Sequence, residues 1–299
     1  MPKTANPTTV EDLRPINILP ALSKAFEHII YDQLSQFLEA NNVLHQYQSG
    51  FRSKHSTCTA LIKVTDDCRA AMDNRQIMLL ALLDFTKAFQ TIDHDIMIAK
   101  LSYHYNFSHQ VLCWFRSYLT DRKQKVIVND TLSNSISVPC GVPQGSILGP
   151  LLFSLYINDL PKHISYSRYH LYADDVQCYI PTSPSNLTNS INNLNTDIEN
   201  ICTWAQQNGL IINPAKSKFM LVGSRRLLSS ITTLDTINIV VNKVAVPLSE
   251  SVTNLGIQLN RYLNWTDHIN KISKKAYGAL HSLQRLKNLL PFCHHYLFM

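Results

Sequence analysis

Three aspartates lie in otherwise apolar stretches of the sequence, where carboxylates are uncommon. Asp84 ends the apolar run MLLALL, and Asp174 and Asp175 are adjacent within LYADDVQCYI. Burying neighbouring carboxylates is costly, and a hard divalent cation is the usual group that offsets such a cost. The alternative is a turn at 174–175 that points into solvent. Asp84 is far from the pair in sequence, so only the tertiary fold can bring the three together.

A segment rich in glycine and proline, CGVPQGSILGP at residues 140–150, contains three of the eight glycines of the chain. Glycine is needed where a backbone or a ligand approaches closely, and proline fixes the path of the chain. Gln144 can make paired hydrogen bonds to a base edge or to a sugar–phosphate. The alternative is a tight turn between two helices, although such turns rarely need three glycines and an amide. An apolar, helix-like run follows the segment.

The hydrophobic pattern predicts the elements that must position these groups. Helices are predicted over 22–38 and over 187–204, the second ending at Asn208 and Gly209. The predicted strands are 77–85, two short strands within 169–180 with Asp174 and Asp175 at their turn, and a hairpin of 126–128 with 136–138. Helices and strands do not alternate regularly, which favours an α+β fold over a doubly wound sheet.

The composition is that of a globular chain. Of the 299 residues, 45% are hydrophobic and 16% are charged, which excludes collagen-like, low-complexity and acidic disordered proteins. The longest apolar run, 77–83, is far shorter than the roughly 20 residues of a membrane span, so no membrane partner is expected. Residues 1–15 include no apolar stretch that could serve as a secretion signal, and the seven scattered cysteines form no CxxC pair. These features predict free thiols in an intracellular protein, cytoplasmic, nuclear or both.

The charge is unevenly distributed along the chain. Residues 1–215 carry 16 Lys and Arg against 18 Asp and Glu, a net charge of −2, and residues 216–299 carry 11 against 3, a net charge of +8. A basic C-terminal third beside a slightly acidic remainder suggests a polyanion-binding arm next to a site that uses carboxylates. The alternative is a basic surface that only maintains solubility.

Four motifs, taken in their order along the chain, resemble those of reverse transcriptases, most of all those of non-LTR (LINE-like) retrotransposons. They are DFTKAFQTIDH (84–94), GVPQGSILGPLLF (141–153), YADD (172–175) and NGLIINPAKS (208–217). YADD alone is weak, and the order of the motifs with the long PQGSILGPLLF string carries the resemblance. Three further matches extend it through nearly the whole chain: RPINILPALSKAFE (14–27), QSGFR (48–52) and NLGIQLNRYLNW (254–265).

The resemblance implies an α+β, right-hand polymerase with fingers, palm and thumb, in which an antiparallel palm sheet packs on helices. It places the fingers at 1–80, the palm at 81–225 with a fingers/palm insertion at about 105–138, and the primer-grip region with the start of the thumb at 226–299. By the same comparison, the fingers are truncated at their N-terminal side and the thumb at its C-terminal side.

The activity implied by the resemblance is extension of a DNA primer on an RNA template with dNTPs, by two-metal phosphoryl transfer. The metal ions would be two Mg²⁺, with Mn²⁺ as an alternative. By matching, Asp84 and Asp174 would bridge the metals and Asp175 would support that site. The main-chain carbonyl of Phe85 would be a further ligand.

The other matched positions would bind nucleotide and primer. Phe89 would reject a ribose 2′-hydroxyl by contact, or it is a core aromatic. Lys216 would protonate the leaving pyrophosphate, or it is a solvated surface lysine. The remaining matches are Lys3 and Arg14 to the triphosphate, Gln144 and Gly145 to the incoming nucleotide and template, and Leu255, Gly256 and Ile257 to the primer grip.

Two other functions stay open at this point. One is a non-catalytic, nucleic-acid-binding remnant of such an element. The other is a two-metal nuclease, which shares paired aspartates but gives no reason for Phe89 or the PQG turn. The basic C-terminal third would hold the backbone of an RNA–DNA duplex without reading its sequence. The sequence does not indicate an oligomeric state.

Overall fold

The computed structural model of the chain describes residues 17–128, 131–231 and 237–287. Its centre is a four-stranded sheet in the order β6-β7-β1-β8, in which all neighbouring strands are antiparallel. The strands are β1 (Ile77–Asp84), β6 (Arg168–Tyr172), β7 (Asp175–Thr182) and β8 (Lys218–Val222). β1 pairs on both sides, and the uninterrupted apolar run in its sequence is typical of such a buried strand.

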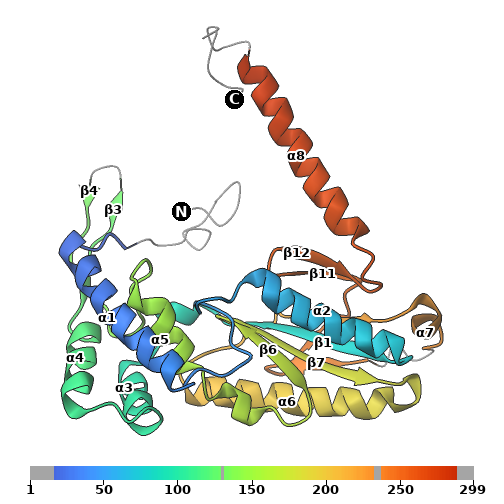
Figure 1. Ribbon diagram of the computed structural model, residues 1–299, viewed down its shortest axis with the longest axis horizontal. Helices are drawn as coiled ribbons and strands as arrows, with labels where there is room; N and C mark the ends of the chain where they lie inside the picture. Colours follow the sequence, from blue (N-terminus) through green and yellow to red (C-terminus); the bar gives the residue numbers. More distant parts are fainter. Residues whose placement is uncertain (1–16, 129–130, 232–236, 288–299) are drawn as a thin grey trace.

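Two helices cover the two faces of this sheet (Figure 1). α2 (Thr57–Asp73) packs on one face, in a core that Met78 and Leu80 of β1 enter. α6 (Leu187–Gln207) packs on the opposite face, in a core that Leu79 and Leu83 of β1 enter. Successive side chains of a strand point to opposite faces, so β1 contributes to both cores in alternation.

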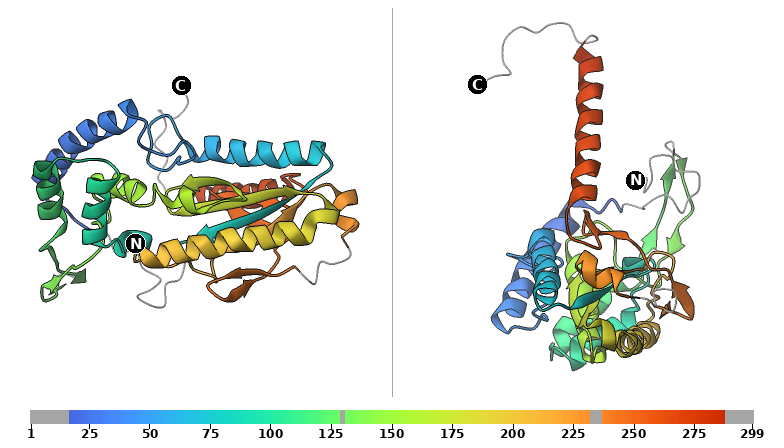
Figure 2. Two further views of the ribbon diagram at one scale, coloured as in Figure 1. Left: turned by 90° about the horizontal axis from the view of Figure 1, so that it is seen from below. Right: turned by 90° about the vertical axis from the view of Figure 1, so that its right-hand side faces the viewer.

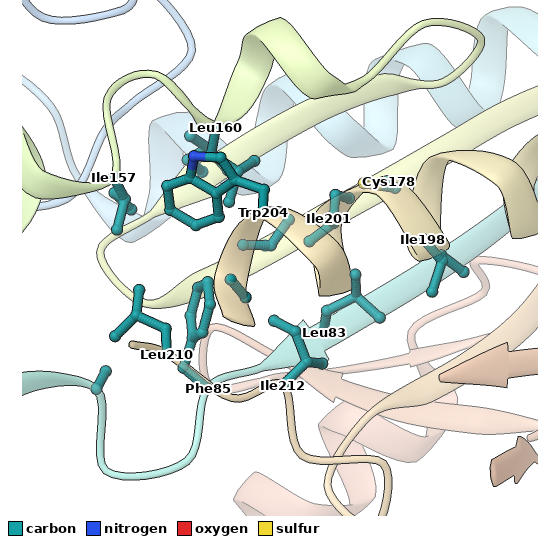
Figure 3. Packing of buried hydrophobic residues seen from close by; sticks show 14 of the residues in the cluster. Leu83, Phe85, Ile157, Leu160, Cys178, Ile198, Ile201, Trp204, Leu210 and Ile212 are labelled. Carbon is teal, nitrogen blue, oxygen red and sulfur yellow. The ribbon is translucent and has the colours of Figure 1, made fainter. Parts of the chain in front are cut away.

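The apolar stripe of α6 forms much of the larger core. Figure 3 shows Ile198 and Ile201 of this helix near Leu83 of β1 and Cys178 of β7, and Trp204 beside Ile157 and Leu160. Each of these side chains is at most 2% exposed. Full burial of a large apolar side chain contributes about 1.5–3 kcal/mol. The stripe therefore anchors α6 to the two strands that end or begin with the aspartates.

A second group of helices lies to one side of the sheet (Figures 1 and 2). Glu27 of the first helix is 2% exposed, and its carboxylate accepts the N–H groups of Ile147 and Leu148 at 2.7 and 3.3 Å. An anionic acceptor at a helix N-terminus is stabilising, so this contact joins two of the helices. The group comprises α1 (Ala21–Ala40), α3 (His94–Tyr103), α4 (His109–Leu119) and α5 (Leu148–Tyr156).

The region between α4 and α5 corrects one prediction from the sequence. Residues 126–128 do not pair with 136–138. Instead, β3 (Ile127–Val128) pairs with β4 (Thr131–Leu132), and β2 (Lys123–Gln124) pairs with β5 (Ile136–Ser137). Ile127 and Ile136 are both 61% exposed. Because the described side chains of these four strands are all exposed, the apolar pattern does not fix their register.

The C-terminal part consists of small hairpins followed by a long helix. α8 projects away from the body of the molecule (Figure 1, and Figure 2, right). Its side chains are almost all exposed up to residue 286. The elements are α7 (Arg225–Ser229), β9 (Ile239–Val241), β10 (Val244–Val246), β11 (Ser251–Asn254), β12 (Ile257–Asn260) and α8 (Thr266–Lys287), and the short 3-10 turns elsewhere are η2 (Ala88–Gln90), η3 (Leu160–His163) and η4 (Pro184–Asn186).

The other predicted elements are confirmed. α6 ends with Asn208 as its C-cap, and Gly209 follows with φ +65°, a conformation that glycine adopts without strain. The α+β class holds. Within the described ranges, no helix is both long enough and apolar enough to cross a membrane. Six cysteines are free thiols, and Cys293 lies outside the described residues.

Candidate active site

Two of the three predicted aspartates face each other across neighbouring strands. Asp84, the last residue of β1, is the register partner of Asp175, the first residue of β7. Directly opposed residues of an antiparallel pair have Cβ atoms about 4.5–5.5 Å apart. Asp174 precedes Asp175 in the turn from β6, and all three aspartates are half-buried. The antiparallel register thus brings together the carboxylates that the sequence singled out.

The electrostatics of this group favour a positive partner. Partial burial raises the pKa of Asp175 to about 6, and the charges of Asp174 and Asp84 act in the same direction, while Lys216 opposes them. Like charges on opposed strands destabilise one another. The cluster is therefore a place where a bound cation would offset repulsion between carboxylates.

Lys216 supplies one positive charge to this site. Its Nζ lies 3.2 Å from Oδ1 of Asp84, and its side chain is 61% exposed. The loop that carries it is fastened to the end of β1, because the N–H of Asn213 donates to the carbonyl of Asp84 and the N–H of Thr86 donates to that of Ile211, both at 2.8 Å. The predicted leaving-group lysine is thus at the aspartate site, held by an ion pair that solvent screens.

A cleft of about 220 Å³ joins the aspartates to the β11–β12 hairpin. The hairpin turns at Leu255 (φ +45°) and Gly256 (φ +87°), as expected of a two-residue loop in which both residues have positive φ. Ile257 follows as the first residue of β12. The residues that line the cleft are Leu82, Leu83, Asp84, Asp175, Val176, Gln177, Lys216, Lys218, Thr253, Asn254, Leu255 and Gly256.

A hydrogen bond between two buried side-chain amides joins this hairpin to β7, the strand that begins with Asp175. Nδ2 of Asn254 donates to Oε1 of Gln177 at 2.7 Å, and the two side chains are 3% and 1% exposed. Gln177 is two residues beyond Asp175, so it projects from the same face of the sheet. This hydrogen bond, together with the burial of Val252 and Leu259 in the smaller core, holds the hairpin close to the strand of Asp175.

Phe85 and Phe89 occupy different environments. Phe85 is 2% exposed and belongs to the core below the site. Phe89 is half-buried, in η2, and its ring stacks on Phe153 with centroids 4.7 Å apart. A second ring, Phe51, meets Phe89 edge-on at 6.0 Å. Phe89 is thus partly a packing residue, yet it keeps an accessible surface.

The glycine-rich segment packs against the loop that carries Phe89. Gly141 (φ +85°) lies so close to the backbone of Gln90 that an added Cβ would meet it at 2.7 Å. The N–H of Val142 donates to the carbonyl of Phe89 at 2.8 Å. Close backbone approach therefore accounts for the glycine at this position.

Gln144 and Gly145, the positions matched to the incoming nucleotide and the template, lie further along the same glycine-rich segment. Gln144 is half-buried, and its carbonyl accepts the N–H of Asn17 at 3.1 Å. Gly145 is exposed, with φ +97°. Lys3 and Arg14, the predicted triphosphate ligands, lie outside the described residues.

Four residues with contacts at this site were not singled out individually from the sequence: Gln48, Phe51, Gln177 and Asn254. A signal for Gln177 existed, because it is the one amide within the apolar stretch VQCYI. Gln48 and Phe51 lie in a short loop and Asn254 ends the four-residue strand β11, and segments this short have too little periodicity to predict contacts. Among the described residues, no three His, Cys, Asp or Glu side chains form a cluster that could already hold a metal ion.

Comparisons with known proteins agree with this geometry. The probable RNA-directed DNA polymerase from transposon BS of Drosophila melanogaster is 28% identical over 285 residues, which cover 93% of this chain and 30% of the relative. The RNA-directed DNA polymerase from mobile element jockey of the same species is 27% identical over 275 residues, covering 90% and 29%. The chain thus spans less than a third of the length of these relatives.

A solved structure shares the fold. Apo telomerase from Candida tropicalis superposes with a TM-score of 0.50 at 10% identity, over 80% of this chain and 39% of that chain. The sequence profile described as reverse transcriptase (RNA-dependent DNA polymerase) matches residues 1–259. That match includes the opposed aspartates, the lysine beside them and the hairpin across the cleft, and the chain belongs to the reverse transcriptase family.

Proposed function

We propose that this chain is the polymerase core of an RNA-directed DNA polymerase from a non-LTR retrotransposon, which extends a DNA primer on an RNA template with dNTPs. The observation that carries the proposal is the cross-strand pairing of Asp84 with Asp175 in the cleft that also holds Lys216 and the β11–β12 turn. In this assignment the fingers occupy 1–80, the palm 81–225 and the primer-grip and thumb region 226–299.

The donor set fits a pair of hard cations. Asp84, Asp174 and Asp175 provide carboxylate oxygens, Phe85 provides a main-chain carbonyl, and oxygen ligands are those that Mg²⁺ and Mn²⁺ prefer. Burial, with the charges of Asp174 and Asp84 beside it, raises the pKa of Asp175 to about 6, and bound cations would relieve the repulsion between these carboxylates. When bound, two Mg²⁺, or Mn²⁺ in their place, would stabilise the attacking and leaving oxygens of an in-line displacement.

The remaining roles belong to side chains of the chain itself. The Phe89 ring, held by contacts with Phe153 and Phe51, would reject a ribose 2′-hydroxyl by contact. Gln144 and Gly145 lie on the loop bound to the Phe89 turn and would contact the incoming nucleotide and template. Lys216, which is exposed and paired with Asp84, would give a proton to the leaving pyrophosphate.

Primer extension by the purified chain tests the proposal. In Mg²⁺ the chain should add dNTPs to a DNA primer annealed to RNA, and Asp174→Ala should abolish the addition. Asp73→Ala is the matched control, because Asp73 is exposed and ends α2, next to the opposite end of β1 from Asp84. It should extend primers at the wild-type rate.

The alternative function gives a different result. A chain whose circular dichroism shows the expected helix and strand content, but which extends no primer in either Mg²⁺ or Mn²⁺, would be a nucleic-acid-binding remnant rather than a polymerase.

A further inference from the structure

A short loop before α2 lies along the outer edge of the sheet. Gln48 forms a parallel bridge with Leu171 of β6, the edge strand. The N–H of Leu171 donates to the carbonyl of Tyr47, and the N–H of Ser49 donates to the carbonyl of Leu171, both at 2.9 Å. Ser49 also bonds His170 through its hydroxyl, at 2.9 Å. The loop is thus fastened to the strand that leads directly into Asp174.

The Gln48 side chain reaches from this loop to the turn itself. It is completely buried, and its Oε1 accepts two backbone N–H groups, that of Gly50 at 2.8 Å and that of Ala173 at 3.2 Å. Ala173 immediately precedes Asp174 and has φ +53°, which is unfavourable for a residue with a Cβ. Such strain persists only where the surroundings hold it in place. The Gln48 oxygen is one of the contacts that hold it.

The backbones of the loop and the turn are also in close contact. A Cβ added to Gly50 would meet the nitrogen of Ala173 at 2.1 Å, so only glycine permits this approach. Phe51, the next residue, is the ring that meets Phe89 edge-on. Residues 48–51 therefore touch both the turn of the aspartates and the ring assigned to the sugar.

We infer that Gln48 is a positioning residue of the polymerase site: its amide oxygen fixes the backbone of Ala173 and thereby the direction in which Asp174 and Asp175 present their carboxylates. The inference rests on the proposed function for its catalytic consequence. Its structural content is independent of that function, because it concerns the order of the turn and the affinity of the aspartates for a divalent cation.

Two substitutions distinguish the effect of the hydrogen-bond acceptor of Gln48 from the effect of its side-chain volume. Gln48→Met fills a similar space without a strong acceptor, and Gln48→Glu keeps an oxygen at the same reach. Gln48→Met should raise the Mg²⁺ concentration that gives half-maximal extension, and it should lower kcat. The combined effect should be about 10- to 100-fold, the range observed when residues that orient metal ligands are replaced. The KM for the primer–template should stay within about twofold, since phosphate contacts set that affinity. Gln48→Glu should recover most of the loss.

A matched control exists at the other end of the same strand. The carboxylate of Asp197 is fully buried and accepts the N–H groups of Ser165 and Ser167 at 2.8 and 2.6 Å, just before β6 begins. Like Gln48, it is a buried acceptor for the backbone of a loop that adjoins β6. Asp197→Asn should lower the thermal unfolding midpoint without changing the Mg²⁺ requirement of the folded enzyme.

Two readouts do not depend on activity. In Gln48→Met the amide hydrogen of Ala173 should exchange faster with solvent, and Mn²⁺ binding followed by electron paramagnetic resonance should weaken. Normal exchange at Ala173 and unchanged Mn²⁺ affinity, with only a lower unfolding midpoint as in Asp197→Asn, would overturn the inference. If the wild-type chain extends no primer, the proposed function fails, and these two measurements still decide the role of Gln48.

Discussion

At the scale of single residues, the side chains of the site have packing partners as well as the chemical roles proposed for them. Phe89 stacks on Phe153 and meets Phe51, while Lys216 forms an ion pair with Asp84. These contacts matter because a side chain held by its neighbours can exclude a substrate group by steric contact, whereas a mobile side chain would move aside. The packing of Phe89 against the core and its proposed role in selecting the sugar are therefore compatible.

Removing this ring should relax the choice of sugar. Phe89→Ala is expected to raise the ratio of rNTP to dNTP incorporation by about tenfold or more, since rejection of one group by contact is worth about 1–3 kcal/mol. Single-nucleotide incorporation with each substrate measures the ratio. Phe37→Ala is the control, because Phe37 is also partly exposed and in ring contact, with Phe107, but lies on α1. An unchanged ratio in Phe89→Ala would remove the sugar-selecting role.

At the scale of elements, the site depends on strand pairing and on one hairpin. Antiparallel pairing of β1 with β7 places Asp84 opposite Asp175, and the hydrogen bond between Asn254 and Gln177 holds the β11–β12 turn over the same strand. The pairing is fixed by apolar residues on both faces of β1. Val252 and Leu259 anchor the hairpin in the smaller core, and the buried amides tie the end of β11 next to the turn to β7.

Breaking the amide pair should displace the hairpin. Asn254→Ala leaves the buried Oε1 of Gln177 without its donor, which should lower the free energy of unfolding by about 1–3 kcal/mol. Extension from a primer end should slow by more than this loss of folded protein explains. Urea unfolding and primer extension on the same preparations test both points. In the double variant that carries Asn254→Ala and Gln177→Leu, the loss in free energy of unfolding should differ from the sum of the two single losses. A loss equal to that sum would show that the two amides act independently.

At the scale of the whole molecule, charge and shape coincide. The sequence after residue 215 carries the excess of positive charge, and α8 from this region stands apart from the body with Lys271, Lys274 and Lys275 on its exposed surface. An exposed basic helix beside a cleft lined by carboxylates is suited to hold the phosphate backbone of a duplex near the aspartates.

Replacing all three lysines by alanine should weaken duplex binding and flatten its salt dependence. The slope of log K against log salt should fall by up to about 3, because each neutralised phosphate contributes about 0.9. Fluorescence anisotropy with an RNA–DNA duplex at several salt concentrations measures this slope. Lys162→Ala, an exposed change in η3 on the body, should leave it unaltered. An equal slope in the triple variant and the wild type would exclude α8 as the binding arm.

The sequence by itself was sufficient for the elements with strong periodicity and for the motifs. The helices α1 and α6 and the apolar β1 strand followed from residue spacing, because burial on a helix face or in a central strand imposes a repeating apolar pattern. The YADD turn and the resemblance to the family followed from the motifs and their order, whereas the long helices α2 and α8 were not predicted. The described side chains of the short strands β2, β3, β4 and β5 have no such burial, and the pairing predicted for this region was wrong for that reason.

The tertiary structure alone decided which distant groups meet. The pairing of Asp84 with Asp175, the ion pair to Lys216, and the contact of Gln48 with Ala173 join segments separated by many residues. Secondary-structure propensity does not predict such contacts, because they depend on strand register and on close backbone approach after the chain has folded. The motifs therefore named the carboxylates, and the packing of β1, β7 and the loop at 48–51 determined how they are held.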